Sequence, residues 1–230
     1  MARYFHFRTA EQLHQAAESL QAEIYLQDDL SPLWQPITIG PYQLGNRLCI
    51  QPMEGCDGTL EGAPDELTFR RYRRFGAGGA KLIWGEATAV LPEARANPRQ
   101  LCWSPENLPA LERLLVECRQ AHRQVWGDDA DLLIGLQLTH SGRYSHWRPL
   151  LAMHDPLLDP LTFDRSTGRF VDESYPLLSD AELQRIEDAF ATAARWAWQI
   201  GCQFVDIKQC HRYLLNELLA ARLRPGRYGG

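Results

Sequence analysis

Residues 131–143 read DLLIGLQLTHSGR, and this stretch decides the fold. Its strand-forming part is apolar almost throughout, as expected for a strand of a parallel sheet that is buried on both faces. Because successive side chains of a strand point to opposite faces, Leu136 and Leu138 are predicted to face covering helices. Gly135 and Gln137 then lie on the inner face, with Gln137 near the carboxyl end of the strand.

Similar runs alternate with amphipathic helices along the rest of the chain. The strand candidates are residues 47–53, 80–89, 131–138 and 202–210. Alternation of short apolar strands with helices is typical of an α/β fold with a parallel sheet and helical crossovers. We therefore expect four β/α units in one domain.

Three helices are marked by their end signals. The first spans about residues 66–75 and is predicted to end at Gly76, and the second is predicted to begin at Ser104-Pro105-Glu106. The third opens with the capping box Ser179-Asp180-Ala181-Glu182. Its apolar residues recur at helical spacing: Leu183, Ile186, Phe190, Ala193, Ala197 and Ile200.

Two segments lie outside this alternation. Residues 1–35 form an amino-terminal extension, with a polar helical stretch around Glu11–Gln21 followed by an extended segment rich in proline. Residues 139–178 form a loop of some forty residues between the third strand and the third helix. Loops of this length typically serve as lids or binding segments, so we expect it to cover a site.

Composition excludes several classes of protein. The 230 residues are 45% hydrophobic and carry a net charge of −5, so there is no basic surface typical of nucleic-acid binding. No apolar run approaches the roughly 18 residues that span a membrane, and the amino terminus does not resemble a signal peptide. The six cysteines are scattered without a CxxC pair, which predicts reduced thiols and a cytoplasmic protein. His140 and His146 lack a third ligand at workable spacing, so no metal is expected.

The fourth predicted strand, like the third, contains polar residues in an otherwise apolar run. If Val205 and Ile207 face the helices, Asp206 and Lys208 point inward. A buried ammonium needs a partner, so either Asp206 neutralises Lys208 or an anionic group of a ligand does. An internal ion pair that only fills a barrel layer is the alternative. For Gln137, the alternative to a ligand contact is an amide bonded to neighbouring backbone.

These motifs, in this order and spacing, resemble the old yellow enzyme family of NADH:flavin oxidoreductases over about residues 36–230. The matching segments are Gln51-Pro52-Met53, residues 78–83 with 86–90, residues 137–143 (similar to the family's QLxHxGR), residues 204–219 and Arg227-Tyr228-Gly229-Gly230. The resemblance implies a (β/α)₈ TIM barrel, of which this chain holds the first four β/α units as an incomplete barrel.

The resemblance also implies a cofactor and its reductant. FMN would lie at the barrel mouth against Pro52, Met53, Glu54, Ala87 and Gln137, with Gln137 bonded to the pyrimidine edge of the flavin. NADH or NADPH would reduce the flavin.

By the same resemblance, the catalytic residues are Lys208, His211 and Tyr213. His211 and Tyr213 match the family pattern, in which the tyrosine donates a proton. Lys208 stands where the family usually has a histidine, and Arg212 stands where it has a glycine. A charged lysine donates hydrogen bonds and could hold a carbonyl oxygen or an anionic substrate.

Three functions follow as hypotheses. The first is an FMN-dependent NAD(P)H:flavin oxidoreductase that transfers hydride to an electron-poor alkene or a related acceptor, an ene-reductase-like reaction on a small-molecule substrate. The second is a non-catalytic half-barrel that lacks the flavin-phosphate site and pairs, through its open edge, with itself or with a complementary half. The third is an unrelated barrel that forms a Schiff base on Lys208.

Overall fold

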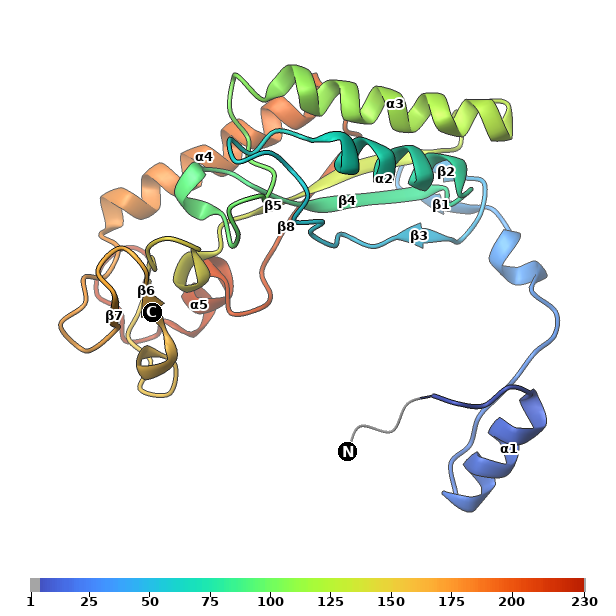
Figure 1. Cartoon of the computed structure of the whole chain (residues 1–230), viewed down its shortest axis with the longest axis horizontal. Coiled ribbons are helices and arrows are strands. Elements are labelled where there is room, and N and C mark those ends of the chain that lie inside the picture. Colours follow the sequence, from blue (N-terminus) through green and yellow to red (C-terminus); the bar gives the residue numbers. More distant parts are fainter. Residues whose placement is uncertain (1–4, 230) are drawn as a thin grey trace.

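A parallel sheet of four strands organises the computed structural model, which describes residues 5–229 (Figure 1). The strand order is β3-β4-β5-β8, and each neighbouring pair is parallel. The strands are β3 (Cys49–Ile50), β4 (Leu82–Ala89), β5 (Leu133–Thr139) and β8 (Phe204–Ile207). The predicted number, order and direction of the strands are confirmed.

All four strands are shorter than predicted, and β3 and β8 differ most. We expected residues 47–53 and 202–210, but β3 has two residues and β8 has four. Pro52 has no amide hydrogen, and the amide of Met53 donates to the carbonyl of Gln51 within a turn. The amide of Lys208 still donates to the carbonyl of Leu138, but the chain turns away soon afterwards. Turn geometry therefore ends both strands before their apolar pattern does.

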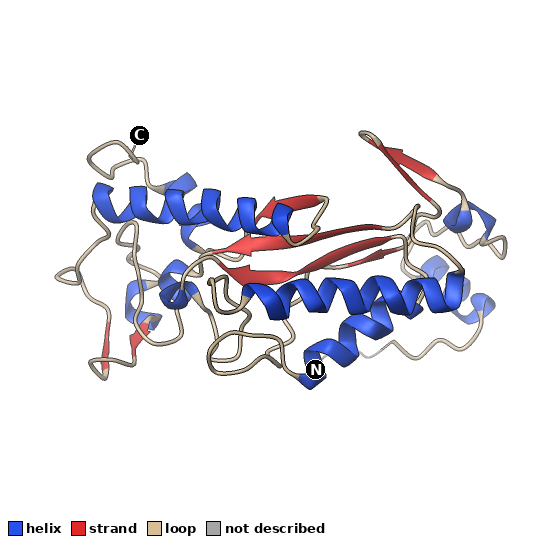
Figure 2. Ribbon diagram, turned by 90° about the horizontal axis from the view of Figure 1, so that it is seen from above, coloured by secondary structure: helices blue, strands red, loops and turns tan. Residues whose placement is uncertain are grey.

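Three helices cover one face of the sheet and run alongside the strands (Figures 1 and 2). They are α2 (Glu66–Ala77), α3 (Leu108–Trp126) and α4 (Asp180–Gln199). Leu136 and Leu138 are fully buried in the core formed with these helices, as their place on the strand predicted. In the described part of the chain, no helix covers the opposite face of the sheet (Figure 1). That face is the one on which the inward-pointing polar residues lie.

Two of the three helix ends that we predicted from sequence signals differ from those in the structure. Helix α2 does not end at Gly76 but continues to Ala77, with Gly78 as its C-cap. A Cβ atom on Gly76 would lie 2.1 Å from the carbonyl oxygen of Cys118, so this glycine permits close packing of α2 on α3. Helix α3 begins at Leu108, with Asn107 as N-cap. Ser104 instead closes the preceding turn by accepting a hydrogen bond from the amide of Asn107.

The predicted start of the third helix is confirmed. Ser179 is the N-cap of α4, and Ser179 and Glu182 form the predicted capping box. The predicted apolar residues of the helix are buried: Leu183, Ile186, Phe190, Ala193, Ala197 and Ile200. The residues predicted from helical spacing are the buried ones because they form one apolar stripe of α4, which faces the sheet.

The amino-terminal segment contains a helix, as predicted, and a hairpin that was not. Helix α1 (Ala10–Ser19) lies apart from the body of the molecule (Figure 1), and a short 3₁₀ helix η1 (Ser31–Trp34) follows. Strands β1 (Ile37–Ile39) and β2 (Tyr42–Leu44) then form an antiparallel hairpin. The hairpin lies between the predicted extension, residues 1–35, and the first predicted strand, where we expected no regular element.

The long loop carries short regular elements. They are the 3₁₀ turns η3 (Gly142–Tyr144) and η4 (Asp159–Leu161) and a small hairpin of β6 (Phe163–Asp164) and β7 (Arg169–Phe170). The 3₁₀ turn η2 (Pro92–Ala94) follows β4, and α5 (Leu214–Ala220) follows β8. The long loop, η2 and α5 gather near the carboxyl ends of the strands (Figure 1).

All six cysteines are free thiols in the structure. Among residues 5–229, no helix combines the length and the apolar character that a membrane span requires.

Candidate functional site

The inner face of the sheet carries a hydrogen-bonded polar group. Ala87, Gln137 and Asp206 lie side by side in the registers of β4, β5 and β8. The carboxylate of Asp206 accepts a hydrogen bond from Gln137 Nε2 at 2.6 Å and one from Trp84 Nε1 at 3.2 Å. The prediction that Gln137 and Asp206 face inward together is consistent with these contacts. The amide of Gln137 is bonded to a carboxylate rather than to backbone.

Lys208 lies just beyond β8 and is 6% exposed. Its Nζ atom is 3.6 Å from Oε1 of Glu54 and 4.5 Å from the centre of the Tyr213 ring. Asp206 is not its ion-pair partner, which corrects one of our two alternatives, because that carboxylate is bonded to Gln137 and Trp84. An ion-paired ammonium acts as a hydrogen-bond donor and not as a nucleophile.

Sequence reasoning missed the pairing of Glu54 with Lys208, although a signal was present. Glu54 closely follows the first strand and Lys208 follows the fourth. Because the carboxyl ends of parallel strands meet at one edge of the sheet, charges placed there can come together. Glu54 also accepts a hydrogen bond from Asn97 Nδ2 at 3.2 Å.

Tyr213 lies beside this ion pair. Burial, and then the nearby carboxylate of Glu54, raises the pKa of Tyr213 well above its usual value. The rings of Tyr144 and His211 are each 6.0 Å from the Tyr213 ring, centre to centre. A phenol in this setting stays protonated at neutral pH and can serve as a proton donor.

His211 and Arg212 both adopt a left-handed backbone conformation, with φ of 61° and 57°. Side chains disfavour this region, which costs roughly 1–2 kcal/mol per residue, and glycine avoids the cost. This geometry explains why a glycine would suit position 212. Both side chains are exposed.

The residues expected against a flavin differ in exposure. Met53 is 74% exposed, Pro52 and Glu54 are half-buried, and Ala87 and Gln137 are buried. A small buried Ala87 leaves room for a flat ring, the thioether of Met53 offers apolar surface, and the amide of Gln137 can bond the edge of a heterocycle. This donor set fits FMN.

A partly buried ion-pair network holds the segment that carries Met53 and Glu54. Arg71 Nη2 lies 2.7 Å from both Asp57 Oδ1 and Glu86 Oε1. Glu86 Oε2 accepts a hydrogen bond from the amide of Gly55 at 2.9 Å. Burial raises the pKa of Glu86, while Arg71 opposes that shift. The network fixes the turn after β3 to β4 and α2.

Arg143, the last residue of the QLTHSGR segment, anchors the long loop. Its side chain is 1% exposed and forms ion pairs with Asp159 and Glu217. It also donates to the carbonyl of Met153 at 2.8 Å. The motif arginine thus joins β5, the long loop and α5, which is a structural role.

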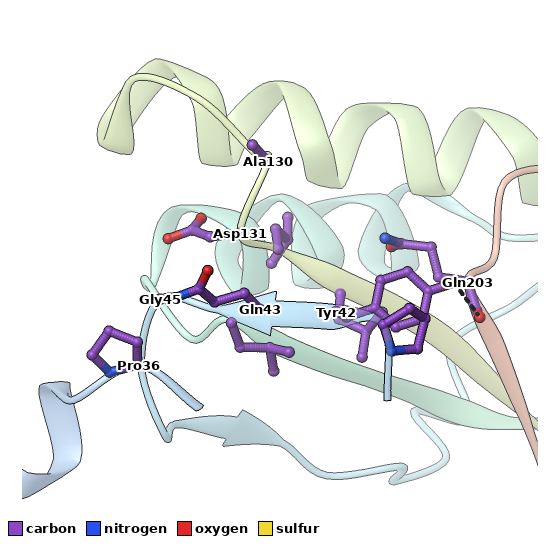
Figure 3. Close-up of a pocket in the computed structure, with 11 residues that line it drawn as sticks. Pro36, Tyr42, Gln43, Gly45, Ala130, Asp131 and Gln203 are labelled. Carbon is purple, nitrogen blue, oxygen red and sulfur yellow. Dashed lines mark hydrogen bonds between the residues drawn. The ribbon is translucent and has the colours of Figure 1, made fainter. Parts of the chain in front are cut away.

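A hollow of about 450 Å³ lies at the opposite, amino-terminal edge of the sheet (Figure 3). Tyr42 and Gln203 line it, and the hydroxyl of Tyr42 donates to the carbonyl of Gln203 at 3.4 Å. Asp131 also lines it and forms an ion pair with Lys81 at 2.6 Å. Because active sites of parallel barrels lie at the carboxyl ends of their strands, we assign no catalytic role to this edge.

A parallel sheet covered by helices, with polar side chains collected at the carboxyl ends of its strands, places this chain in the class of parallel α/β folds. Within that class, this chain belongs to the NADH:flavin oxidoreductase / NADH oxidase family, whose model matches residues 32–230.

The chain is similar to curated and solved members of this group. It is 28% identical over 203 residues to an NADPH dehydrogenase of Geobacillus sp. (strain WCH70), covering 86% of this chain and 54% of that protein. The NADPH dehydrogenase of Bacillus subtilis is 27% identical with the same coverage. The chain therefore spans about half the length of the curated relatives it matches.

Solved structures share the fold. The Old Yellow Enzyme from Pichia sp. AKU4542 superposes with a TM-score of 0.71 at 20% identity, over 86% of this chain and 52% of that one. The old yellow enzyme homologue from Zymomonas mobilis gives a TM-score of 0.65 at 25% identity, over 86% and 54%.

Proposed function

We propose that this chain supplies the substrate-holding and proton-donating part of an FMN-dependent NAD(P)H oxidoreductase, with the first half of a TIM barrel as its scaffold. The acceptor is an electron-poor alkene conjugated to a carbonyl. The observation that carries the proposal is the cluster of Lys208 and Tyr213 at the carboxyl end of β8, held together by Glu54. Family membership supplies the flavin chemistry.

Each residue has a distinct role in this proposal. The ammonium of Lys208, with His211, holds the carbonyl oxygen of the acceptor as negative charge develops on it. The phenol of Tyr213 delivers a proton to the carbon next to the carbonyl. Bound FMN would supply the hydride, obtained from NADH or NADPH, to the neighbouring carbon.

The chain's other named residues would hold the cofactor. Pro52, Met53 and Ala87 contribute apolar surface, and Gln137 bonds the edge of the heterocycle while Asp206 orients its amide. Glu54, which we first placed among the flavin contacts, acts through Lys208 by keeping the ammonium in position.

Flavin binding by the purified chain tests the proposal. We expect FMN fluorescence to be quenched on titration with the chain, and Gln137→Ala to weaken that binding. Single-turnover reoxidation with 2-cyclohexenone would then show acceptor reduction. A chain that folds but leaves FMN fluorescence unchanged would contradict the proposal for this chain.

The second candidate is a non-catalytic half-barrel that is stable only when it pairs with a second copy or with a complementary half. It is supported by the uncovered inner face, by the single neighbour of each edge strand, β3 and β8, and by the 47% exposure of Ile207. Unpaired sheet edges favour association with another chain or a second copy. Analytical ultracentrifugation of the purified chain, with and without FMN, separates this candidate from the first.

A further inference from the structure

A second cavity, of about 680 Å³, is lined by residues of the long loop, by residues 96–98 and by Arg212, and it lies next to the proposed catalytic cluster of Lys208 and Tyr213. Two of its lining residues connect it with that cluster. Tyr144 packs near Tyr213 at 6.0 Å between ring centres, and Asn97 donates to Glu54, the partner of Lys208. The cavity and the cluster are therefore neighbours at this end of the sheet.

The cavity wall is cationic. Arg143, Arg165 and Arg212 line it, and no aspartate or glutamate does. The charge of Arg143 is compensated by Asp159 and Glu217. Within residues 5–229, the guanidinium groups of Arg165 and Arg212 have no hydrogen-bond or ion-pair partner.

The same wall offers apolar surface. Trp147, Leu161 and Phe163 line the cavity with exposed fractions of 62%, 77% and 46%. Aromatic and aliphatic side chains beside unpaired guanidinium groups suit a ligand with an apolar body and an anionic end.

The backbone at Arg212 gives an independent reason to look for a role for this side chain. Its φ of 57° lies in the region that glycine adopts at no cost. An arginine there is strained, and its side chain lines the cavity. Strained residues of this kind concentrate at ligand-binding sites.

We propose that Arg165 and Arg212 form an anion-binding subsite, which takes a carboxylate or phosphate carried on an apolar molecule. This inference deepens the proposed function and rests on it for the position of the reacting end. Two sources share this chemistry: an alkene acceptor with a remote carboxylate, and the phosphate of the nicotinamide coenzyme.

Equilibrium binding tests the subsite without flavin or turnover, so its outcome is separate from that of the proposed function. Isothermal calorimetry would compare cinnamate with the neutral cinnamamide, and NADPH with NADH, on the purified full chain. The variants are Arg165→Gln, Arg212→Gln and the double variant. Arg70→Gln is the matched control because Arg70 is an exposed residue of α2 that does not line the cavity.

We expect each single variant to weaken binding of the anionic probe about three- to fivefold, and the double variant about tenfold, because exposed ion pairs are individually weak. Raising the salt to 1 M should reduce the wild-type preference for the anion. If the double variant binds cinnamate more weakly than the wild type does, the subsite takes the acceptor. If it binds only NADPH more weakly, the subsite takes the coenzyme.

Arg212→Gly separates binding from folding. It should raise the denaturation midpoint by relieving the backbone strain, and yet weaken anion binding as Arg212→Gln does. If neither cinnamate nor NADPH binds more weakly to the double variant than to Arg70→Gln, the subsite does not exist.

Discussion

The Nζ atom of Lys208 lies 3.6 Å from Oε1 of Glu54, and the two side chains are 5% and 16% exposed. The pair joins the turn after the first sheet strand to the end of the fourth. A mostly buried pair of this kind is costly to break because the remaining charge is left without its partner.

Glu54→Gln should therefore destabilise the chain by about 1–3 kcal/mol, since it keeps the shape of the side chain and leaves the ammonium buried. Urea denaturation measures the free energy of unfolding. Glu61→Gln is the control, because Glu61 is exposed. In the double variant Glu54→Gln/Lys208→Met the loss should be smaller than in Glu54→Gln alone. With Lys208→Met measured alone, a double-variant loss equal to the sum of the two single losses would mean that the two charges are not coupled.

Tyr213→Phe should slow flavin reoxidation by an alkene ~10²- to 10⁴-fold, which is the typical contribution of a general acid. Reduction of the flavin by NADPH should change little. Because burial and Glu54 raise the pKa of Tyr213, its proton stays in place well into alkaline solution, and wild-type reoxidation should not lose this donor between pH 7 and 9. Stopped-flow absorbance of a flavin-loaded chain measures both half-reactions. Equal slowing of the two would argue for a packing role instead.

Gly76→Ala should destabilise the chain by about 1–3 kcal/mol, although alanine favours a helix interior over glycine by roughly 1 kcal/mol. The added Cβ would lie 2.1 Å from the carbonyl oxygen of Cys118 and would push α2 away from α3. Gly78→Ala is the matched control, since its φ is −71° and its nearest contact, the carbonyl oxygen of Arg74, is 3.1 Å away. Thermal denaturation compares the two, and a stabilised Gly76→Ala would show that the helices can separate without cost.

Burial lowers the pKa of His140 to about 4 from an ordinary value of 6.5. Between about pH 4 and pH 6.5, His140 therefore binds a proton in the unfolded chain but not in the folded chain. The contribution of His140 to stability is therefore complete above about pH 6.5 and is lost as the pH falls toward 4, by up to about 3 kcal/mol.

His140→Asn should flatten this part of the pH dependence of unfolding, as measured by urea denaturation from pH 4.5 to 7. His14→Asn, at an exposed position of α1, should leave the slope unchanged. An unchanged slope in His140→Asn would show that other groups carry the acid sensitivity.

Local sequence determined the four strands of the parallel sheet, the three helices that cover it, and their order. Gln137 is a polar residue in an apolar run, and the capping box at Ser179 marks the start of α4. Both can be recognised in the sequence because strand alternation and helix capping depend only on neighbouring residues. The family motifs placed Lys208, His211 and Tyr213 in one run of sequence, and their catalytic roles remain predictions.

Only the tertiary structure decided which charges meet and where some elements end. The pairing of Glu54 with Lys208 joins residues from the first and fourth sheet strands. The role of Gly76 depends on the approach of a second helix, and the side chains of Arg165 and Arg212 share one cavity because the long loop returns to the sheet edge. Such contacts depend on the packing of segments far apart in the chain, which local propensity and periodicity do not encode.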